Sequence, residues 1–284
     1  MEIPKKIVWL ASYPKSGNTW FRAFLSALLG DGDVDINDMK TDGIFSSRQI
    51  FDLCTDLDST YLPDEEVKLL QPEVFNYLAT ITDKERLFIK VHDAYTLNQS
   101  DKPIIPVEST ICALYFIRNP LDVACSFANH LSGTTDEAIA VMNNPNGMLA
   151  RQKENLNVNN QFRQLLLSWS EHAESWTLQT NFPVLLIRYE DMLADTRTVF
   201  TQAARFIGIS ADAGQIEQAI SASKFSRLKQ IENDKGFKES RYGRTFFRQG
   251  ESGNWKNELH SQQVDIIISN HTKLMQLHNY FIDI

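Results

Sequence analysis

The sequence predicts an α/β fold in which a central parallel sheet is flanked by helices. Short, continuous apolar runs are typical of strands that are buried on both faces of a parallel sheet. Such runs occupy residues 7–11, 87–91, 111–117 and 184–187. Helical spacing alternates with these runs, which favours layered α/β architecture. The first run also leads directly into a turn and helix with the character of a phosphate-binding loop.

The segments between the strands predict helices. Apolar residues recur every three or four positions over residues 20–29, 165–176 and 199–207. Gly30 follows the first of these stripes and is a typical helix stop. Pro120 is expected to open a further helix after the third strand, since proline is favoured in the first helical turn.

A chain of 284 residues could form one large domain or two small ones. Because repeats, low-complexity segments and a clear linker are absent from the sequence, we expect one domain, residues 1–284. A net charge of −8 does not indicate a nucleic-acid surface. The three cysteines are widely spaced and include no C-x-x-C pair, which suits a reducing compartment. The apolar stretch near the N-terminus is too short for a signal peptide or a membrane span. We therefore expect a cytoplasmic protein with no membrane partner.

Three polar segments are expected to be surface insertions that select the substrate: residues 31–64, 132–160 and 229–246. The acidic run at 31–42 has some features of a calcium loop. Ile36 stands where the tight turn needs glycine, however, and Asp42 stands where the loop ends in glutamate. We interpret this run as a solvated acidic loop and predict no metal site.

The segment that joins the first strand to the first helix predicts an anion site. Lys15, Ser16, Gly17 and Thr19 lie at the start of that helix, where backbone N–H groups and the helix dipole favour a phosphate. The common P-loop places its lysine after the second glycine, whereas Lys15 precedes the only glycine here. Magnesium-bound ATP is therefore not the first expectation. The alternative is an ordinary capped turn with a solvated lysine.

The other strand ends also carry polar groups. In open α/β sheets, ligands bind beyond the carboxyl ends of the strands. Lys90 and His92 close the second strand on one face. Arg118 follows the third strand, with Ser126 inside the next helix, and 188–191 follows the fourth. The sequence thus predicts a shared site at this edge of the sheet.

Residues 246–256 predict a second anion site. Arg248 supplies a guanidinium and Gly250 allows the backbone to come close, so that both can approach one phosphate. A plain polar turn before the last helix is the alternative.

Together these motifs resemble the cytosolic-type sulfotransferases that use 3′-phosphoadenosine 5′-phosphosulfate (PAPS). Residues 13–20 resemble the family's 5′-phosphosulfate loop, and residues 248–256 match its R-x-G-x-x-G-x-W-[KR] signature. Arg118 and Ser126 match its 3′-phosphate pair, and 188–192 resembles the strand end whose tyrosine reaches the adenine. The motifs follow the family order over nearly the whole chain. The resemblance therefore implies the sulfotransferase fold, which is similar to that of P-loop nucleotide transferases.

The resemblance implies a role for each matching residue. Those around the 5′-phosphosulfate are Lys15, Ser16, Gly17, Asn18 and Thr19. Those around the adenine are Trp20, Tyr189, Ser223, Phe225 and Phe246. Those near the 3′-phosphate are Arg118, Ser126, Arg248, Gln249 and Gly250.

The implied reaction is transfer of the sulfuryl group to a small alcohol, phenol or amine. Lys15, Lys90 and His92 are the implied catalytic residues, with His92 as the general base. Lysines and a helix end supply the positive field, so no metal is expected. The alternatives are a nucleotide phosphotransferase of related fold and a catalytically silent nucleotide-binding module. The protein itself could form a homodimer by an interface that the sequence does not specify, since residues 256–265 do not match the family's dimer motif.

Overall fold

The computed structural model describes residues 2–150, 160–240 and 245–280. The chain divides into two compact units, which are described separately below. Unit 1 consists of Met1–Tyr13, Asp42–Tyr115 and Pro145–Leu185, and unit 2 of Pro14–Thr41, Phe116–Asn144 and Leu186–Ile284. The expectation of a single domain over 1–284 stays a prediction.

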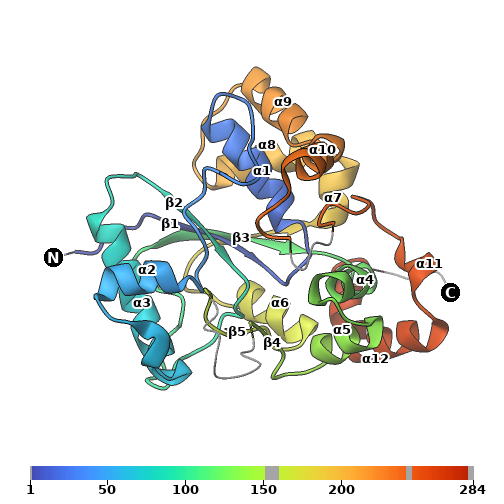
Figure 1. Cartoon of the computed structure of the whole chain (residues 1–284), viewed down its shortest axis with the longest axis horizontal. Coiled ribbons are helices and arrows are strands. Elements are labelled where there is room, and N and C mark those ends of the chain that lie inside the picture. Colours follow the sequence, from blue (N-terminus) through green and yellow to red (C-terminus); the bar gives the residue numbers. More distant parts are fainter. Residues whose placement is uncertain (1, 151–159, 241–244, 281–284) are drawn as a thin grey trace. The chain divides into compact units, whose positions relative to one another are not determined.

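The central sheet has four strands in the order β2-β1-β3-β6 (Figure 1). These are β1 Ile7–Ser12, β2 Leu87–Val91, β3 Thr110–Ile117 and β6 Val184–Arg188. β1 and β2 pair in parallel, with Ile7 opposite Leu87 and Ala11 opposite Val91. Every residue of β1 is buried, as expected for a strand covered on both faces. The four predicted strands are confirmed to within one residue at either end.

Unit 1 adds short helices and a small hairpin to this sheet. Its elements are α2 Arg48–Thr55, the 3₁₀ helix Ser59–Tyr61, α3 Asp64–Ile81, β4 Met148–Leu149, β5 Gln164–Leu165 and α6 Trp169–Thr177. Trp9 of β1 packs edge-on against the rings of Phe45 and Phe75, with centroids 5.6 and 5.4 Å away. This aromatic cluster is the centre of the unit 1 core.

Unit 2 is helical. Its helices are α1 Asn18–Leu29, α4 Pro120–Leu131, α5 Thr135–Met142, α7 Tyr189–Ala194, α8 Thr196–Phe206, α9 Ala213–Ala222, α10 Phe225–Lys235, α11 Trp255–Glu258 and α12 Ser261–Leu277. α1 packs on α9, and α4 packs on α5, α11 and α12 (Figure 1). The rings of Phe24 and Phe200 pack closely in the core of this unit, with centroids 4.5 Å apart.

The third predicted helix, 165–176, begins later than its apolar spacing suggested. Leu165 lies in β5, and α6 starts at Trp169. The reason is a capping box: the Ser168 hydroxyl accepts from the Glu171 N–H, and the Glu171 carboxylate accepts from the Ser168 N–H. The cap, rather than the apolar stripe, fixes the first turn.

The three predicted insertions contain more helix than expected, which corrects their interpretation as loops. Residues 31–64 include α2, residues 132–160 include α5, and α10 extends into 229–246. The apolar faces of these short helices are buried, for example Phe51 of α2 and Met142 of α5. Parts of the insertions, 151–159 and 241–244, lie outside the described residues.

In the described part of the chain, helices that combine the length and the apolarity needed to cross a bilayer do not occur.

Candidate functional site

The turn after β1 has an unusual backbone. Lys15 and Gly17 both have positive φ angles, 72° and 100°. A Cβ atom on Gly17 would lie 2.7 Å from Cδ2 of the Tyr189 ring. Residue 17 must therefore be glycine for two reasons, the backbone conformation and the close approach of an aromatic ring. A non-glycine residue in the left-handed region, such as Lys15, is often found where a loop is shaped around a ligand.

The first turn of α1 follows this loop directly and supplies backbone N–H donors. Gly17 is the N-cap of α1, and no side chain of the described residues caps the helix there. Ser16 is only 1% exposed, and its Oγ has no hydrogen-bond partner among the described residues. A buried hydroxyl without a partner is costly unless a ligand or ion satisfies it. The loop therefore fits the phosphate or sulfate oxygens that its sequence predicted.

Arg118 lies directly after β3 and connects three segments of unit 2. Its Nη1 donates to the carbonyl of Lys15 at 3.3 Å, and its Nη2 donates to the carbonyl of Glu251 at 2.8 Å. Its guanidinium carbon lies 4.3 Å from the centre of the Tyr189 ring. The structure thus brings the predicted phosphate loop and the predicted 3′-phosphate arginine together.

Arg248 is held beside α4 and α11. Its Nη2 lies 3.1 Å from Oε1 of Glu258, and its Nη1 donates to the Cys125 carbonyl at 3.5 Å. The Arg248 guanidinium therefore contacts the peptide group that joins Cys125 to Ser126. The Glu258 carboxylate is an anionic partner of Arg248 in this structure.

Two carboxylates hold the loop of residues 246–256 through its backbone N–H groups, and the sequence analysis identified neither of them. Asp122 accepts from the backbone N–H groups of Gly253 and Trp255, at 2.8 and 3.2 Å. Glu232 accepts from the N–H groups of Phe246 and Phe247, at 2.6 and 2.9 Å. An acidic residue in the first turn of a helix usually serves its own helix, so Asp122 carried no signal of this distant role.

Aromatic rings lie against the phosphate loop, residues 15–19, and against the loop of residues 246–256. The Nζ of Lys15 lies 3.6 Å from the centre of the Phe246 ring. A Cβ atom on Gly250, whose φ is 68°, would lie 2.3 Å from the Phe225 ring. Trp20 lies edge-on to Tyr189, with centroids 6.0 Å apart. These rings are candidates for stacking on a base.

Three predicted residues show less connection to this cluster. Ser223 is fully buried, and its hydroxyl donates to the Ala219 carbonyl at 2.9 Å within the end of α9. Gln249 is exposed. Asn18 is buried in the first turn of α1, in line with a backbone contribution.

In unit 1, His92 follows β2 directly, and Lys90 precedes it on the same face. Both side chains are half-buried, on either side of the buried Val91. Nδ1 of His92 lies 2.8 Å from the Ser12 carbonyl oxygen and 3.2 Å from the Ser12 hydroxyl. A carbonyl can only accept, so a neutral His92 carries its proton on Nδ1. Its basic lone pair is then on Nε2.

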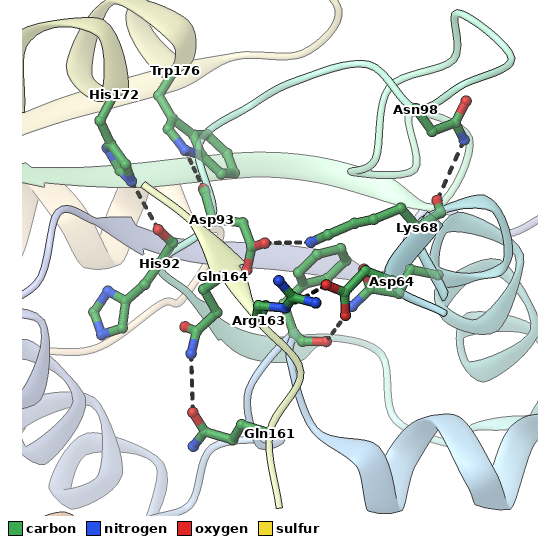
Figure 2. Close-up of polar contacts among 12 residues, drawn as sticks. Asp64, Lys68, His92, Asp93, Asn98, Gln161, Arg163, Gln164, His172 and Trp176 are labelled. Carbon is green, nitrogen blue, oxygen red and sulfur yellow. Dashed lines mark hydrogen bonds and ion pairs between the residues drawn. The ribbon is translucent and has the colours of Figure 1, made fainter. Parts of the chain in front are cut away.

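The residues after His92 are anchored to three elements of unit 1 (Figure 2). The buried Asp93 carboxylate accepts from Lys68 Nζ at 2.5 Å, and the Asp93 carbonyl accepts from Trp176 Nε1 at 3.0 Å. Burial raises the pKa of Asp93, while the Lys68 charge opposes this shift. The Ala94 N–H donates to the Leu165 carbonyl at 2.8 Å. His92 therefore sits at the start of a rigidly held segment.

Comparison with known proteins supports the resemblance that the sequence motifs predicted. The family model described as "Sulfotransferase domain" matches residues 5–277. The chain is 26% identical over 277 residues to a flavonol 3-sulfotransferase of Flaveria bidentis, covering 92% of this chain and 78% of that protein. It is 24% identical over 271 residues to cytosolic sulfotransferase 10 of Arabidopsis thaliana, covering 91% and 74%.

Solved structures show the same fold. Mouse sulfotransferase SULT7A1 complexed with PAP has a TM-score of 0.59 and 18% identity, covering 97% of this chain and 85% of that chain. Retinol dehydratase in complex with androsterone and PAP also has a TM-score of 0.59, with 19% identity and coverage of 95% and 82%. The predicted α/β architecture is confirmed by these neighbours.

Proposed function

Because the chain belongs to the sulfotransferase domain family, we propose that it transfers the sulfuryl group of PAPS to a hydroxyl or amine of a small molecule. One observation carries the assignment of the donor site: within unit 2, Arg118 donates to the Lys15 carbonyl beside the buried, unpartnered Ser16 hydroxyl. Two neighbours of known structure are complexed with PAP (3′,5′-bisphosphoadenosine), the nucleotide left after sulfuryl transfer from PAPS.

The phosphate loop holds the reacting end of the donor in this proposal. Residues 15–19 surround the 5′-phosphosulfate with the first N–H groups of α1, the Ser16 hydroxyl and the Lys15 ammonium. The bound donor supplies an activated sulfuryl group on a good leaving phosphate. Lys15 stabilises the negative charge that develops on that phosphate.

The other end of the donor rests on three groups of residues. Arg118, Ser126, Arg248 and Gly250 hold the 3′-phosphate, with Gln249 at the solvent side. Trp20, Tyr189, Ser223, Phe225 and Phe246 line the adenine. Two of these rings, Tyr189 and Phe225, lie close to Gly17 and Gly250, which have positive φ.

His92 acts as the general base. The Ser12 carbonyl fixes the Nδ1–H tautomer, so Nε2 takes the proton of the acceptor hydroxyl as its oxygen attacks sulfur. Lys90, two residues earlier, adds positive charge on the same face of the strand. The imidazolium formed in this step stays hydrogen-bonded to Ser12 through Nδ1.

The acceptor is a small alcohol, phenol or amine. Relatives are named for flavonol and, in Photinus pyralis, for luciferin. Cys54, Cys112 and Cys125 are all free, and related proteins are named as cytosolic, so we place the reaction in the cytosol. The family match over 5–277 supports treating both units as one functional domain.

Calorimetry and radiolabelled sulfuryl transfer test the proposal. We expect PAP to bind in the presence of EDTA, and more tightly than ATP with magnesium. We also expect labelled PAPS to modify members of an alcohol, phenol and amine panel. Preference for ATP with magnesium would favour a phosphotransferase instead. PAP binding without transfer to any acceptor would favour a silent binding module.

A further inference from the structure

α6 carries a buried histidine that the proposed reaction does not use directly. His172 is 0% exposed. Its Nε2 lies 3.0 Å from the carbonyl oxygen of His92, and its Nδ1 lies 2.8 Å from the Tyr115 hydroxyl. Figure 2 shows the His172 ring reaching from α6 to the backbone of His92, while the His92 ring points away from it.

The chemistry of these partners fixes the direction of both hydrogen bonds. Burial lowers the pKa of His172 to about 4, so its ring is neutral at physiological pH. The His92 carbonyl can only accept, which places the one ring proton on Nε2 of His172. Nδ1 is then an acceptor, and the Tyr115 hydroxyl donates to it. Tyr115 therefore donates to His172, and His172 donates to the backbone carbonyl of His92, which makes a chain of donors.

A second side chain of α6 acts on the next peptide group. Trp176, four positions after His172 and so on the same helix face, donates to the Asp93 carbonyl at 3.0 Å. Two consecutive carbonyls after β2 therefore accept from successive turns of one helix. The His92 ring is held separately, through Nδ1, by the Ser12 carbonyl at the end of β1.

We propose that His172 is a positioning residue for the sulfuryl transfer: through its hydrogen bond to the His92 carbonyl, it fixes the backbone from which the His92 imidazole reaches the acceptor proton. This proposal rests on the proposed function, in which His92 is the general base. A general base must lie within hydrogen-bond reach of the proton that it takes, and small misplacements lower the rate strongly.

Two substitutions separate positioning from packing. His172→Phe keeps an aromatic ring beside Tyr13 but removes the donor to His92. His172→Gln offers an amide N–H that can replace Nε2. We expect kcat to fall by about tenfold to a hundredfold in His172→Phe, because a misplacement of about 1 Å can cost a hundredfold. We expect His172→Gln to recover most of this loss, and the Kd for PAP to stay unchanged in both.

A readout that needs no turnover accompanies the kinetics. In the ¹⁵N spectrum of histidine-labelled protein, we expect His92 of the wild type to show a single tautomer with the proton on Nδ1. His172→Phe should give a mixed or broadened His92 signal, and His172→Gln should restore it. Val74→Ala, a buried truncation on α3, is the control for lost stability alone and should change neither kcat nor the His92 signal.

The outcomes are distinguishable. A folded His172→Phe variant with wild-type kcat and an unchanged His92 signal would overturn the positioning role, as would equal losses in His172→Phe and His172→Gln. If His172→Phe does not fold, Tyr115→Phe, which removes one hydroxyl from the same chain of donors, should still lower kcat and broaden the His92 signal. If the wild type transfers no sulfuryl group, the proposed function fails, whereas the spectra still test what holds His92.

Discussion

The Nδ1 atom of His92 lies 2.8 Å from the carbonyl oxygen of Ser12, the last residue of β1. This contact selects the ring tautomer, because a carbonyl accepts a proton but cannot donate one. Lys15 follows Ser12 after only two intervening residues. Ser12, which orients the proposed base, therefore lies only a few residues before the loop proposed to hold the donor.

His92→Asn is expected to lower kcat by about 10²–10⁴-fold, the usual contribution of a general base. The asparagine amide can still donate to Ser12, so the local structure should persist while the basic nitrogen is lost. PAP affinity, measured by calorimetry, should match the wild type. Near-normal turnover in this variant would show that another group takes the proton.

Arg118→Ala is expected to weaken PAP binding and to reduce the preference for PAPS over a donor that lacks the 3′-phosphate. The physical reason is the loss of a guanidinium that also ties Lys15 to Glu251. Arg197→Ala is the matched control, since Arg197 forms an exposed ion pair with Glu217 on the surface of unit 2. An unchanged preference for the complete donor in Arg118→Ala would contradict the assignment.

Glu258→Gln is expected to tighten PAP binding by about twofold to fivefold, the range that corresponds to a partly exposed ion pair. In the structure Glu258 holds Arg248 at 3.1 Å, and this pair must open or share its arginine when a 3′-phosphate binds. Removing the carboxylate charge removes that competition. Glu217→Gln is the control, and calorimetric titration at two salt concentrations is the measurement. Weaker binding in Glu258→Gln would mean that the carboxylate helps to orient Arg248 instead.

Gly17→Ala and Gly236→Ala separate backbone strain from steric contact. Both glycines have positive φ, so alanine at either position should lower the free energy of unfolding by about 1–3 kcal/mol. An alanine Cβ at position 17 would also lie 2.7 Å from the Tyr189 ring, whereas at position 236 it would meet no described atom within 4 Å. Urea unfolding should therefore show the larger loss in Gly17→Ala, and PAP binding should fail only there. Equal effects would show that the Tyr189 contact is unimportant.

Stability should fall as the pH is lowered from 6.5 towards 4, partly because of His172. Its pKa is about 4 in the folded protein and about 6.5 in the unfolded chain, so only the unfolded chain gains a proton over this range. The contribution of His172 is thus present above pH 6.5 and is lost as the pH falls. At pH 5 the loss is about 2 kcal/mol.

His172→Gln isolates this effect in urea unfolding at pH 7 and pH 5, since it lacks the titrating ring. The loss of stability between these two pH values should be smaller in the variant by about 2 kcal/mol. Asp93 acts in the opposite direction, because burial raises its pKa in the folded protein, but it is present in both proteins. An identical pH dependence in the two proteins would show that His172 is not the group responsible.

Neighbouring residues in the sequence were enough to predict the local elements of the fold. Continuous apolar runs identified all four strands of the central sheet. The glycine, lysine and hydroxyls after β1 predicted an anion loop, which stays a prediction. These features are encoded by neighbouring residues, so a short window of sequence contains the whole signal. The ordered motifs from the loop to residue 256 identified the family, which the match over 5–277 confirmed.

The distant side chains that contact these motifs could be identified only from the packing of the folded chain. Asp122 lies in the first turn of α4, yet it holds Gly253 and Trp255, and His172 lies within α6, yet it contacts the backbone of His92. The start of α6 likewise depended on a cap that the apolar spacing did not reveal. Such contacts join residues far apart in the chain, and their partners are set by how the elements pack, which no local pattern of residues records.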